Sequence, residues 1–424
     1  MLQQQDEDLT DLALRGKNVF QGHDNNNNNN KNGDNHDPHK RDHTHNNNNN
    51  HLPHLTVFVE ALKVNTVLQS LTLTGCGLTA QSCTVLSDFL MDSDNQSVAE
   101  LFLDDNPDIG DQGVAILATA LEQNSILWKL SLKGVSMADG GAKSLGEWLS
   151  ENPPLEQLHV GNNHITDNGT AALVWALESN GNLERLWLSQ NRIGDNGAEL
   201  FGMCLTMNNT MTVLGLDQNG IGDRGAVAIG SGLAENDALE QLSLRNNSVG
   251  DIGAAALAKG MSCNGALIRL TLWNNRIGDG GAEALGQALQ RNECLEQLGL
   301  RGNHIGDRGA ADLATSLSRN SSLLRLGLGS NRVGNVGAGA FGEMLVSNTR
   351  LEELGLGYNV LSCEGAKKLA VGLRENGVLY KLDVAGNAIK ADGAAVLLLE
   401  CGGGNGGGGE GRNVDRLEKL QVML

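Results

Sequence analysis

The hydrophobic residues of this chain recur in a fixed order from about residue 54 onwards. Leu183-Glu-Arg-Leu-Trp-Leu-Ser-Gln-Asn191 and Leu295-Glu-Gln-Leu-Gly-Leu-Arg-Gly-Asn303 are two copies of one string, and both continue into Ile-Gly-Asp-x-Gly-Ala. The Asn of this string returns in steps of 28 residues, at Asn163, Asn191, Asn219, Asn247, Asn275, Asn303, Asn331, Asn359 and Asn387. Earlier units place Val135, Asn106 and Cys76 at this position, so the pattern predicts about twelve copies of one small unit.

Each unit predicts a short strand followed by a helix. Leucines at every second position of Leu-x-Leu indicate a strand that directs them to one side. The Asn that follows can bond the backbone of neighbouring turns through its side-chain amide, so we expect the Asn column to form a ladder. Cys76 is a weak-donor substitute in this column, whereas Val135 has no side-chain donor. Gly then eases a turn, and Asp, such as Asp279, is expected to be the N-cap of the helix.

Stacking of such units predicts the fold class. Parallel strands lie about 4.8 Å apart, whereas packed helices need about 8–10 Å. A stack of strand–helix units therefore bends into an arc with its strands inside. We expect an α/β horseshoe solenoid with a parallel sheet on the concave face and helices on the convex face.

The unit L-x-x-L-x-L-x-x-N-x-I-G-D-x-G-A resembles the 28-residue repeat of the ribonuclease-inhibitor class of leucine-rich repeats. It is most similar to the repeat domain of NOD-like receptors, and it is related to the repeats of the Ran GTPase-activating protein. The resemblance covers roughly residues 54–400. It implies a right-handed leucine-rich-repeat horseshoe that binds a partner protein, but it does not identify the partner.

Composition divides the chain into four segments. Residues 1–51 are expected to be a disordered Asn/His-rich tail, because the Asn tracts at 25–30 and 46–50 cannot bury apolar surface. The histidines of this tail could bind a metal loosely, but no closed ligand spacing is present, so compositional drift is the favoured interpretation. Residues 52–400 are the predicted solenoid, 401–412 a Gly-rich insert, and 413–424 a partial terminal strand beginning at Leu417.

The charge and cysteine content restrict the partners and the compartment. A formal net charge of −19 disfavours nucleic acid and anionic membrane surfaces, because both require a basic face. Seven cysteines without a paired spacing indicate reduced thiols, and the acidic first residues lack the apolar segment of a signal peptide. We therefore expect a cytoplasmic protein without a membrane span.

The motifs that resemble catalytic or binding signatures are explained by the repeat. Gly337-Ala-Gly-Ala-Phe-Gly342 matches G-x-G-x-x-G, but it falls at the start of a repeat helix rather than directly after a strand. The Asp column could suggest calcium sites, yet each unit supplies one carboxylate, which helix capping accounts for. We therefore expect no enzyme activity, no cofactor and no metal site.

The strand residues between and just after the inward leucines face the concave side. There, Trp and Arg stand out from small and polar neighbours, and we expect the partner-binding residues to be Arg185, Trp187, Arg245, Arg269, Trp273, Arg301 and Arg325. Glycines at 299, 327, 329, 355 and 357 are expected to leave a bare floor. The alternative is that these side chains merely cover the sheet, with Arg stacked on Trp.

The leading functional hypothesis is a non-catalytic interaction scaffold or sensor. Its partner would be another protein with an acidic or mixed acidic and apolar surface. The alternative is a GTPase-activating regulator of the Ran-activating type, whose repeats end in a strongly acidic tail. This chain instead continues into glycines at 402–409.

Overall fold

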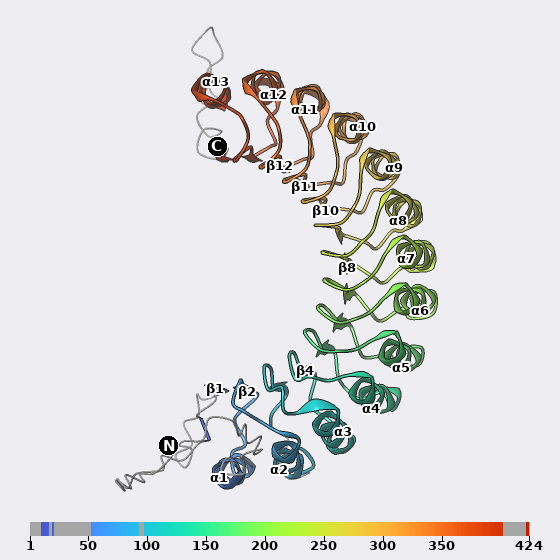
Figure 1. Cartoon of the computed structure of the whole chain (residues 1–424), viewed down its shortest axis with the longest axis vertical. Coiled ribbons are helices and arrows are strands. Elements are labelled where there is room, and N and C mark those ends of the chain that lie inside the picture. The colour runs from blue at the N-terminus through green and yellow to red at the C-terminus, as the bar shows by residue number, and fades with distance from the viewer. Residues whose placement is uncertain (1–9, 17–18, 21–51, 93–96, 402–420, 424) are drawn as a thin grey trace, which may run out of the picture.

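The computed structural model describes residues 10–16, 19–20, 52–92, 97–401 and 421–423, coloured by position in Figure 1. The two Asn tracts, the six histidines from His23 to His51, and the Gly-rich insert lie outside these residues. The expectations for those segments therefore stay predictions.

Strands and helices alternate along the described chain. The strands are β1 Asp11–Arg15, β2 Ser70–Thr74, β3 Glu100–Phe102, β4 Lys129–Ser131, β5 Gln157–His159, β6 Arg185–Trp187, β7 Val213–Gly215, β8 Gln241–Ser243, β9 Arg269–Thr271, β10 Gln297–Gly299, β11 Arg325–Gly327, β12 Glu353–Gly355, β13 Lys381–Asp383 and β14 Gln421–Met423. The helices are α1 Leu52–Lys63, α2 Ala80–Leu90, α3 Gly110–Leu121, α4 Asp139–Ser150, α5 Asp167–Leu177, α6 Asp195–Leu205, α7 Asp223–Glu235, α8 Asp251–Cys263, α9 Asp279–Leu289, α10 Asp307–Leu317, α11 Asn335–Ser347, α12 Cys363–Glu375 and α13 Ala391–Cys401. None of these described helices is long and apolar enough to cross a membrane.

All fourteen strands form one parallel sheet in sequence order. Equivalent residues of successive units lie side by side, as Leu270 of β9 does opposite Leu298 of β10. The strands line the inside of an arc and the helices form its outer layer (Figure 1). The predicted α/β solenoid is confirmed, and its curvature follows from the closer spacing of strands than of helices.

The core lies between the sheet and the helices and repeats from unit to unit. In the unit of β6 and α6, Leu183, Leu186 and Leu188 of the strand segment are at most 1% exposed. Ile193 in the turn and Phe201 of α6 are fully buried against the same core. Each unit buries its apolar side chains against its neighbours, so the stack has one continuous core.

The Asn column joins each turn to its neighbours. The side-chain Nδ2 of Asn275 donates to the carbonyl oxygens of Leu244 and Leu272 at 2.9 and 3.1 Å. Its Oδ1 accepts from the backbone N–H of Val249 at 3.0 Å. The amide therefore satisfies backbone groups of its own turn and of the preceding one, and the same contacts recur at Asn303.

A second Asn column follows the helices, on the opposite edge of the stack from the first. Asn292 donates to the carbonyl oxygens of Met261 and Asn264 at 2.8 and 3.2 Å. Its Oδ1 accepts from the backbone N–H of Leu295 at 2.7 Å. This side chain therefore also bridges successive units, because it donates hydrogen bonds to carbonyl oxygens at the end of the preceding helix.

The sheet begins within the segment predicted as a tail, so that boundary is wrong at residues 11–15. β1 pairs in parallel with β2, with Leu12 opposite Leu71 and Leu14 opposite Leu73. The Sγ of Cys76 donates to the carbonyl oxygen of Leu14 at 3.4 Å, in the way that the ladder Asn residues contact the preceding turn. β1 thus supplies a strand of the repeat, because its alternating leucines cover the edge of the core.

The last strand, β14, pairs with β13 two residues further along the chain than the repeat pattern would place it. The sequence pattern Leu417-Glu-Lys-Leu-Gln-Val422 places Leu420 at the second leucine position of a repeat. In the structure Val422 occupies that position, opposite Leu382 of β13. Leu417 and Leu420 lie outside the described residues. A register slip of two residues keeps the same side chains facing inward, so the pattern alone does not distinguish the two registers.

The Asp column caps the helix of the following unit rather than its own helix. Gly278 is the N-cap of α9, and Asp279 is the first helical residue. The Oδ1 of Asp279 accepts from the backbone N–H groups of Gly306 and Gly309 at 2.7 and 3.0 Å, at the start of α10. The expectation that Asp279 is the N-cap of its own helix is therefore wrong, because its carboxylate caps the helix of the following unit. A glycine N-cap has no side-chain acceptor, and the neighbouring carboxylate supplies one.

Glycines allow several helices to approach closely. A Cβ on Gly260 of α8 would collide with the carbonyl oxygen of Gly230 in α7, and a Cβ on Gly232 would collide with that of Gly202 in α6. The helical backbones are therefore in direct contact on the convex side from α6 to α8.

Candidate functional site

The concave face carries three parallel columns of side chains, because successive strands align in register. They are the first and third residues of each strand and the residue two positions after it. From β6 to β13 the first column is Arg185, Val213, Gln241, Arg269, Gln297, Arg325, Glu353 and Lys381. The middle column is Trp187, Gly215, Ser243, Thr271, Gly299, Gly327, Gly355 and Asp383. The third is Ser189, Asp217, Arg245, Trp273, Arg301, Gly329, Gly357 and Ala385.

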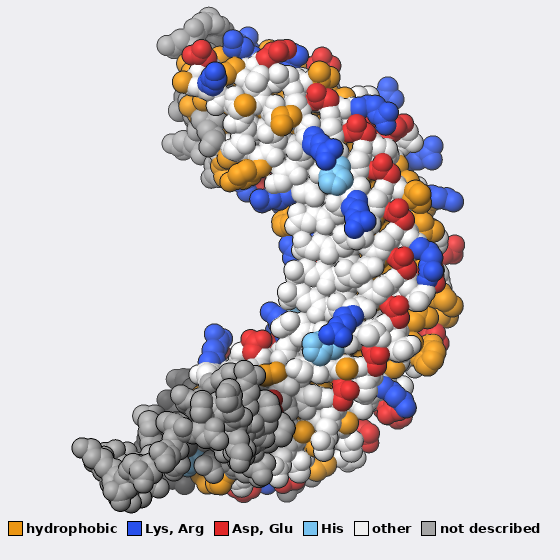
Figure 2. Space-filling view, viewed as in Figure 1, with side chains coloured by type: hydrophobic (Ala, Val, Ile, Leu, Met, Phe, Trp, Pro, Cys, Tyr) orange, Lys and Arg blue, Asp and Glu red, His pale blue; other side chains and the backbone are white. Residues whose placement is uncertain are grey.

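Side chains of these columns line a groove of about 670 Å³, which we call the concave groove and which extends from Trp187 to Met423. Six of the seven predicted partner-binding residues line it, and the exception is Arg185, an exposed residue of β6. Its lining includes five cationic side chains and three carboxylates, although the whole chain carries a net charge of −19. Figure 2 shows that several Lys and Arg side chains lie at the concave edge of the molecule.

Trp187 forms one end of the groove and is half-buried. Its indole lies against Gly215 of the next strand, where a Cβ would be 2.8 Å from the ring atom Cδ1. On its other side the ring stacks on His159, with ring centroids 3.8 Å apart and an interplanar angle of 20°. Trp187 is therefore held between two neighbouring strands instead of projecting freely.

The environment of His159 favours its neutral form. Burial, together with the positive charges of Lys129 and Lys133, lowers the pKa of His159 to about 4. A neutral imidazole is compatible with the close stack on Trp187, whereas a charged one would need hydration that this site restricts.

Lowering the pH from 7.5 to 5 is expected to destabilise the wild type more than a His159→Gln variant. The unfolded state binds a proton on His159 near pH 6.5, whereas the folded state binds it near pH 4. The stability from the neutral ring is therefore present above pH 6.5 and is lost as the pH falls towards 4. After allowance for partial exposure, the difference is about 1–2 kcal/mol by pH 5. Thermal melts at both pH values measure it, and equal pH slopes for the two proteins would contradict the assignment.

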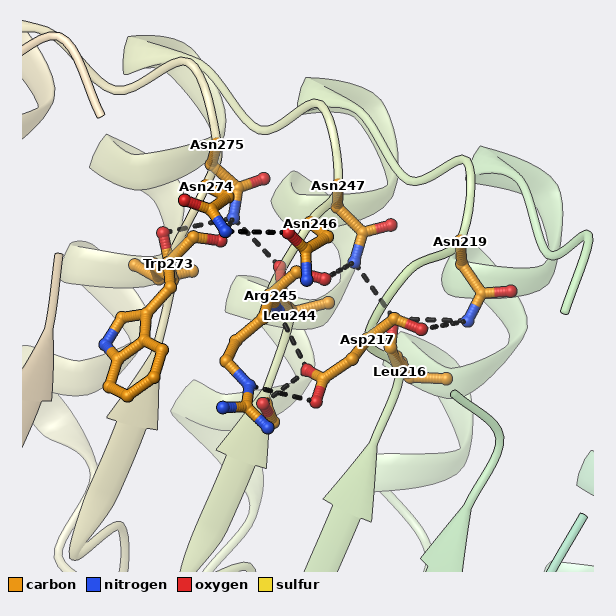
Figure 3. A network of polar contacts seen from close by, with 12 residues as sticks. Leu216, Asp217, Asn219, Leu244, Arg245, Asn246, Asn247, Trp273, Asn274 and Asn275 are labelled. Carbon is orange, nitrogen blue, oxygen red and sulfur yellow. Dashed lines mark hydrogen bonds and ion pairs between the residues drawn. The ribbon is translucent and has the colours of Figure 1, made fainter. Parts of the chain in front are cut away.

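Arg245 belongs to a local network around Trp273 (Figure 3). Its Nε lies 3.1 Å from Oδ2 of Asp217, and the Asp217 Oδ1 accepts from the backbone N–H of Arg245 at 2.8 Å. The hydroxyl of Ser243 also donates to that carboxylate. The Arg245 guanidinium carbon lies 5.0 Å from the centre of the Trp273 ring. At Arg245 the structure therefore has the arrangement of the covering alternative, because the guanidinium lies over the Trp273 ring. The charge of Arg245 is also offset by Asp217.

The floor of the groove is bare at some glycines and covered at others. A Cβ on Gly299 would collide with the indole Nε1 of Trp273, so this indole lies over Gly299. That Nε1 is buried and has no hydrogen-bond partner among the described residues. At Gly327 the nearest atom to an added Cβ is 4.0 Å away, and at Gly355 it is 3.7 Å away. The expected bare floor is therefore wrong at position 299 and also at 357, where an added Cβ would lie 2.8 Å from the Asp383 carboxylate, whereas no side chain lies within 4 Å of an added Cβ on Gly327 or Gly355.

Three arginines around this floor have no ion-pair partner within the part of the chain that the structure describes: Arg269, Arg301 and Arg325. Arg269 and Arg301 are exposed, and Arg325 is half-buried. We call these residues the arginine triad. Because none of the three is in a described ion pair, their guanidinium donors can bind carboxylates or other anions, although the charge of Arg325 also acts on Glu353 of the next strand.

The groove also contains groups that the sequence reasoning missed. Glu353 accepts a hydrogen bond from the hydroxyl of Tyr380 at 2.9 Å and contacts the Nζ of Lys381 at 3.1 Å. Partial burial raises the pKa of Glu353, but these two hydrogen bonds and the charges of Lys381 and Arg325 outweigh it, so the net pKa is lowered. Tyr358 is 61% exposed and occupies the position that Asn274 and Gln218 hold in other units. An aromatic residue in an otherwise polar column is the sequence signal that could have identified Tyr358 as a groove residue.

Buried thiols are the other strongly perturbed groups. Burial raises the pKa of Cys76 to about 11 and the pKa of Cys83 and Cys204 to about 12. These thiols therefore stay protonated at neutral pH and are poor nucleophiles. In the described part of the chain, no group of three or more His, Cys, Asp or Glu residues is arranged to hold a metal ion.

Comparison with known protein families supports the repeat assignment. The family described as Leucine Rich repeat matches seven segments, residues 151–174, 179–202, 208–230, 236–258, 268–286, 291–314 and 319–342. These segments, which lie within residues 151–342, follow the strand–helix units of the structure and support their assignment as leucine-rich repeats. At the level of sequence, no curated protein matches this chain.

Several solved structures are similar in part. An internalin (inlF) from Listeria monocytogenes is 20% identical, with 80% of this chain and 88% of that chain covered and a TM-score of 0.41. A chain of the yeast Rad7 and Elc1 complex is 16% identical, with 80% of this chain and 85% of that chain covered and a TM-score of 0.44. The plant peptide hormone receptor RGFR1, in complex with RGF2, is 16% identical, with 78% and 61% covered and a TM-score of 0.37.

Proposed function

We propose that this chain is a non-catalytic interaction scaffold or sensor whose concave groove binds a protein with an acidic or mixed acidic and apolar surface. The observation that carries the proposal is the arginine triad, which lies around the uncovered glycines Gly327 and Gly355 in a protein of net charge −19. Guanidinium groups without partners bind carboxylates well, and Trp273 and Tyr358 add aromatic surface at the edges of the same groove.

The finer class and the compartment are part of this proposal. The 28-residue unit and its Asn column support the ribonuclease-inhibitor class of repeats, with most similarity to NOD-like receptors. Six cysteines, from Cys76 to Cys363, are free thiols, which supports a reducing compartment such as the cytoplasm.

A double reversal, Arg269→Glu/Arg325→Glu, is expected to abolish partner capture. Both guanidiniums have no ion-pair partner among the described residues, so their replacement breaks no described salt bridge and makes the groove acidic. The measurement is affinity capture by the immobilised chain from the cells that make it, with the retained proteins identified and quantified by mass spectrometry. Specific partners should be retained at least about tenfold less well by the double variant.

The matched control is Lys259→Glu, which reverses an exposed charge on α8 at the convex side. It should retain the same partners as the wild type. Loss of capture with Lys259→Glu, together with normal capture by the double variant, would place the binding surface on the helices and contradict the proposal.

The GTPase-regulator alternative makes a different prediction about catalysis. Single-turnover GTP hydrolysis by Ran-type GTPases would be accelerated by a regulator and left unchanged by a binding scaffold. Clear acceleration that depends on the concave groove would replace the scaffold proposal.

A further inference from the structure

The arginine triad has a spacing that selects among ligand conformations. Arg269 and Arg325 lie in the same column, on β9 and β11, with one strand between them. At about 4.8 Å per strand, their backbone positions are about 9.6 Å apart. Arg301 lies in the column on the other side of the floor and follows β10, the strand between them. A ligand must therefore offer carboxylates to both sides of the floor within this length.

A polyproline II segment has this geometry. It rises about 3.1 Å per residue with three residues per turn, so residues three apart lie on one side and about 9.3 Å apart. A β-strand places residues three apart on opposite sides. An α-helix is about 10–12 Å wide and would hold its backbone away from the glycine floor. Of the three conformations, only polyproline II, with three residues per turn, presents acidic residues on two sides and small residues on the third side.

The glycine floor and the aromatic side chains beside it fit the side of such a segment that carries small residues. At Gly327 and Gly355 only backbone atoms lie within 4 Å of an added Cβ, so no side chain in the middle column keeps a ligand backbone at a distance there. Trp273 lies at one end of this floor, and Tyr358 lies beyond it with its ring 6.0 Å from the Arg301 guanidinium carbon. Aromatic side chains beside a shallow groove are typical of sites that bind polyproline II segments.

We propose that the concave groove over β9–β12 binds an acidic polyproline II segment of a partner protein. Two acidic residues three positions apart contact Arg269 and Arg325, a third between them contacts Arg301, and a Pro, Ala or Gly residue faces the floor at Gly327. This inference rests on the proposed function, because it names the partner chemistry of the same groove.

The probe is a fluorescein-labelled peptide with four repeats of Pro-Glu-Glu, which places all prolines on one side and carboxylates on the other two. One control has the same composition with blocks of two Pro and four Glu, so that no side is free of carboxylate. A second control is a helical peptide of Ala and Glu with the same charge. Fluorescence polarisation with the full chain should show at least about tenfold tighter binding of the first peptide than of either control.

Two protein variants separate charge from shape. Arg269→Gln/Arg325→Gln removes two donors, and Gly327→Val fills the floor without changing any charge. A Cβ at position 327 has no atom closer than 4.0 Å, so Gly327→Val should keep its fold, as checked by circular dichroism and thermal melts. Both variants should weaken binding of the Pro-Glu-Glu peptide at least about tenfold, whereas Lys259→Gln should not weaken it.

The outcomes distinguish this inference from the proposed function. Equal affinity for the two Pro/Glu peptides, stronger binding of the helical peptide, or unchanged binding by folded Gly327→Val would overturn the polyproline II inference. Partner capture could then still depend on Arg269 and Arg325, and the proposed function would stand. No binding of any of the peptides would likewise overturn the inference. Capture that is independent of both arginines would overturn the proposed function itself.

Discussion

Replacing Asn275 with Ala lowers the free energy of unfolding by about 3 kcal/mol, because three buried backbone groups lose their partner at once. The Asn275 amide donates to the carbonyl oxygens of Leu244 and Leu272, and its Oδ1 accepts from the N–H of Val249. Asn275 is 5% exposed, so water replaces these bonds poorly. Urea titration followed by circular dichroism measures the loss.

The control for this variant is the preceding residue. Asn274 is exposed and has a positive φ of 51°, which Gly adopts without strain. Asn274→Gly removes only a surface hydrogen bond to Asn246 and is expected to change stability by no more than about 0.5 kcal/mol. If both variants lose the same stability, the ladder is not the source of the effect.

Gly260→Ala is expected to destabilise the protein by about 2–3 kcal/mol, although Ala favours a helix over Gly. The new Cβ would collide with the carbonyl oxygen of Gly230, so α7 and α8 must move apart. Because each unit contacts its neighbours, the separation also disturbs the curvature on the convex side. The unfolding free energy from urea titration measures the loss, and small-angle X-ray scattering should detect the change in shape.

Gly339→Ala is the matched control, because it introduces the same methyl group into another repeat helix. Gly339 lies in α11, and the nearest atom to its added Cβ is Cδ of Lys368, at 2.9 Å in a flexible side chain. The gain in helix propensity should then dominate, with a stabilisation of up to about 1 kcal/mol. Similar destabilisation by both substitutions would show that backbone contact between helices is not what makes Gly260 necessary.

The sequence was informative about interactions that repeat identically in every unit. The spacing of leucines predicted the strands, and the Asn column marked the side chains that bond neighbouring turns at Asn275 and its equivalents. These features share a physical cause: each unit has the same neighbours, so one local pattern specifies a contact that recurs along the stack.

The sequence was less informative about contacts between side chains of successive units. It grouped Arg245 with the other concave arginines, but Asp217, in the same column one unit earlier, pairs with it. It treated Gly299 as bare, but Trp273 of the preceding unit lies over it. Both outcomes depend on side-chain directions across neighbouring strands, which a repeat pattern does not encode.

By itself the sequence determined that this protein is a stack of strand–helix units with a concave sheet, and it indicated which columns face the groove. The tertiary structure decided which arginines keep free charge, where the floor is open, and that each Asp, such as Asp279, caps the following helix. It also decided that residues 11–15 join the sheet as β1. The physical reason is that periodicity fixes the neighbours of each unit, whereas charge pairing and packing depend on distances that exist only after the units have stacked.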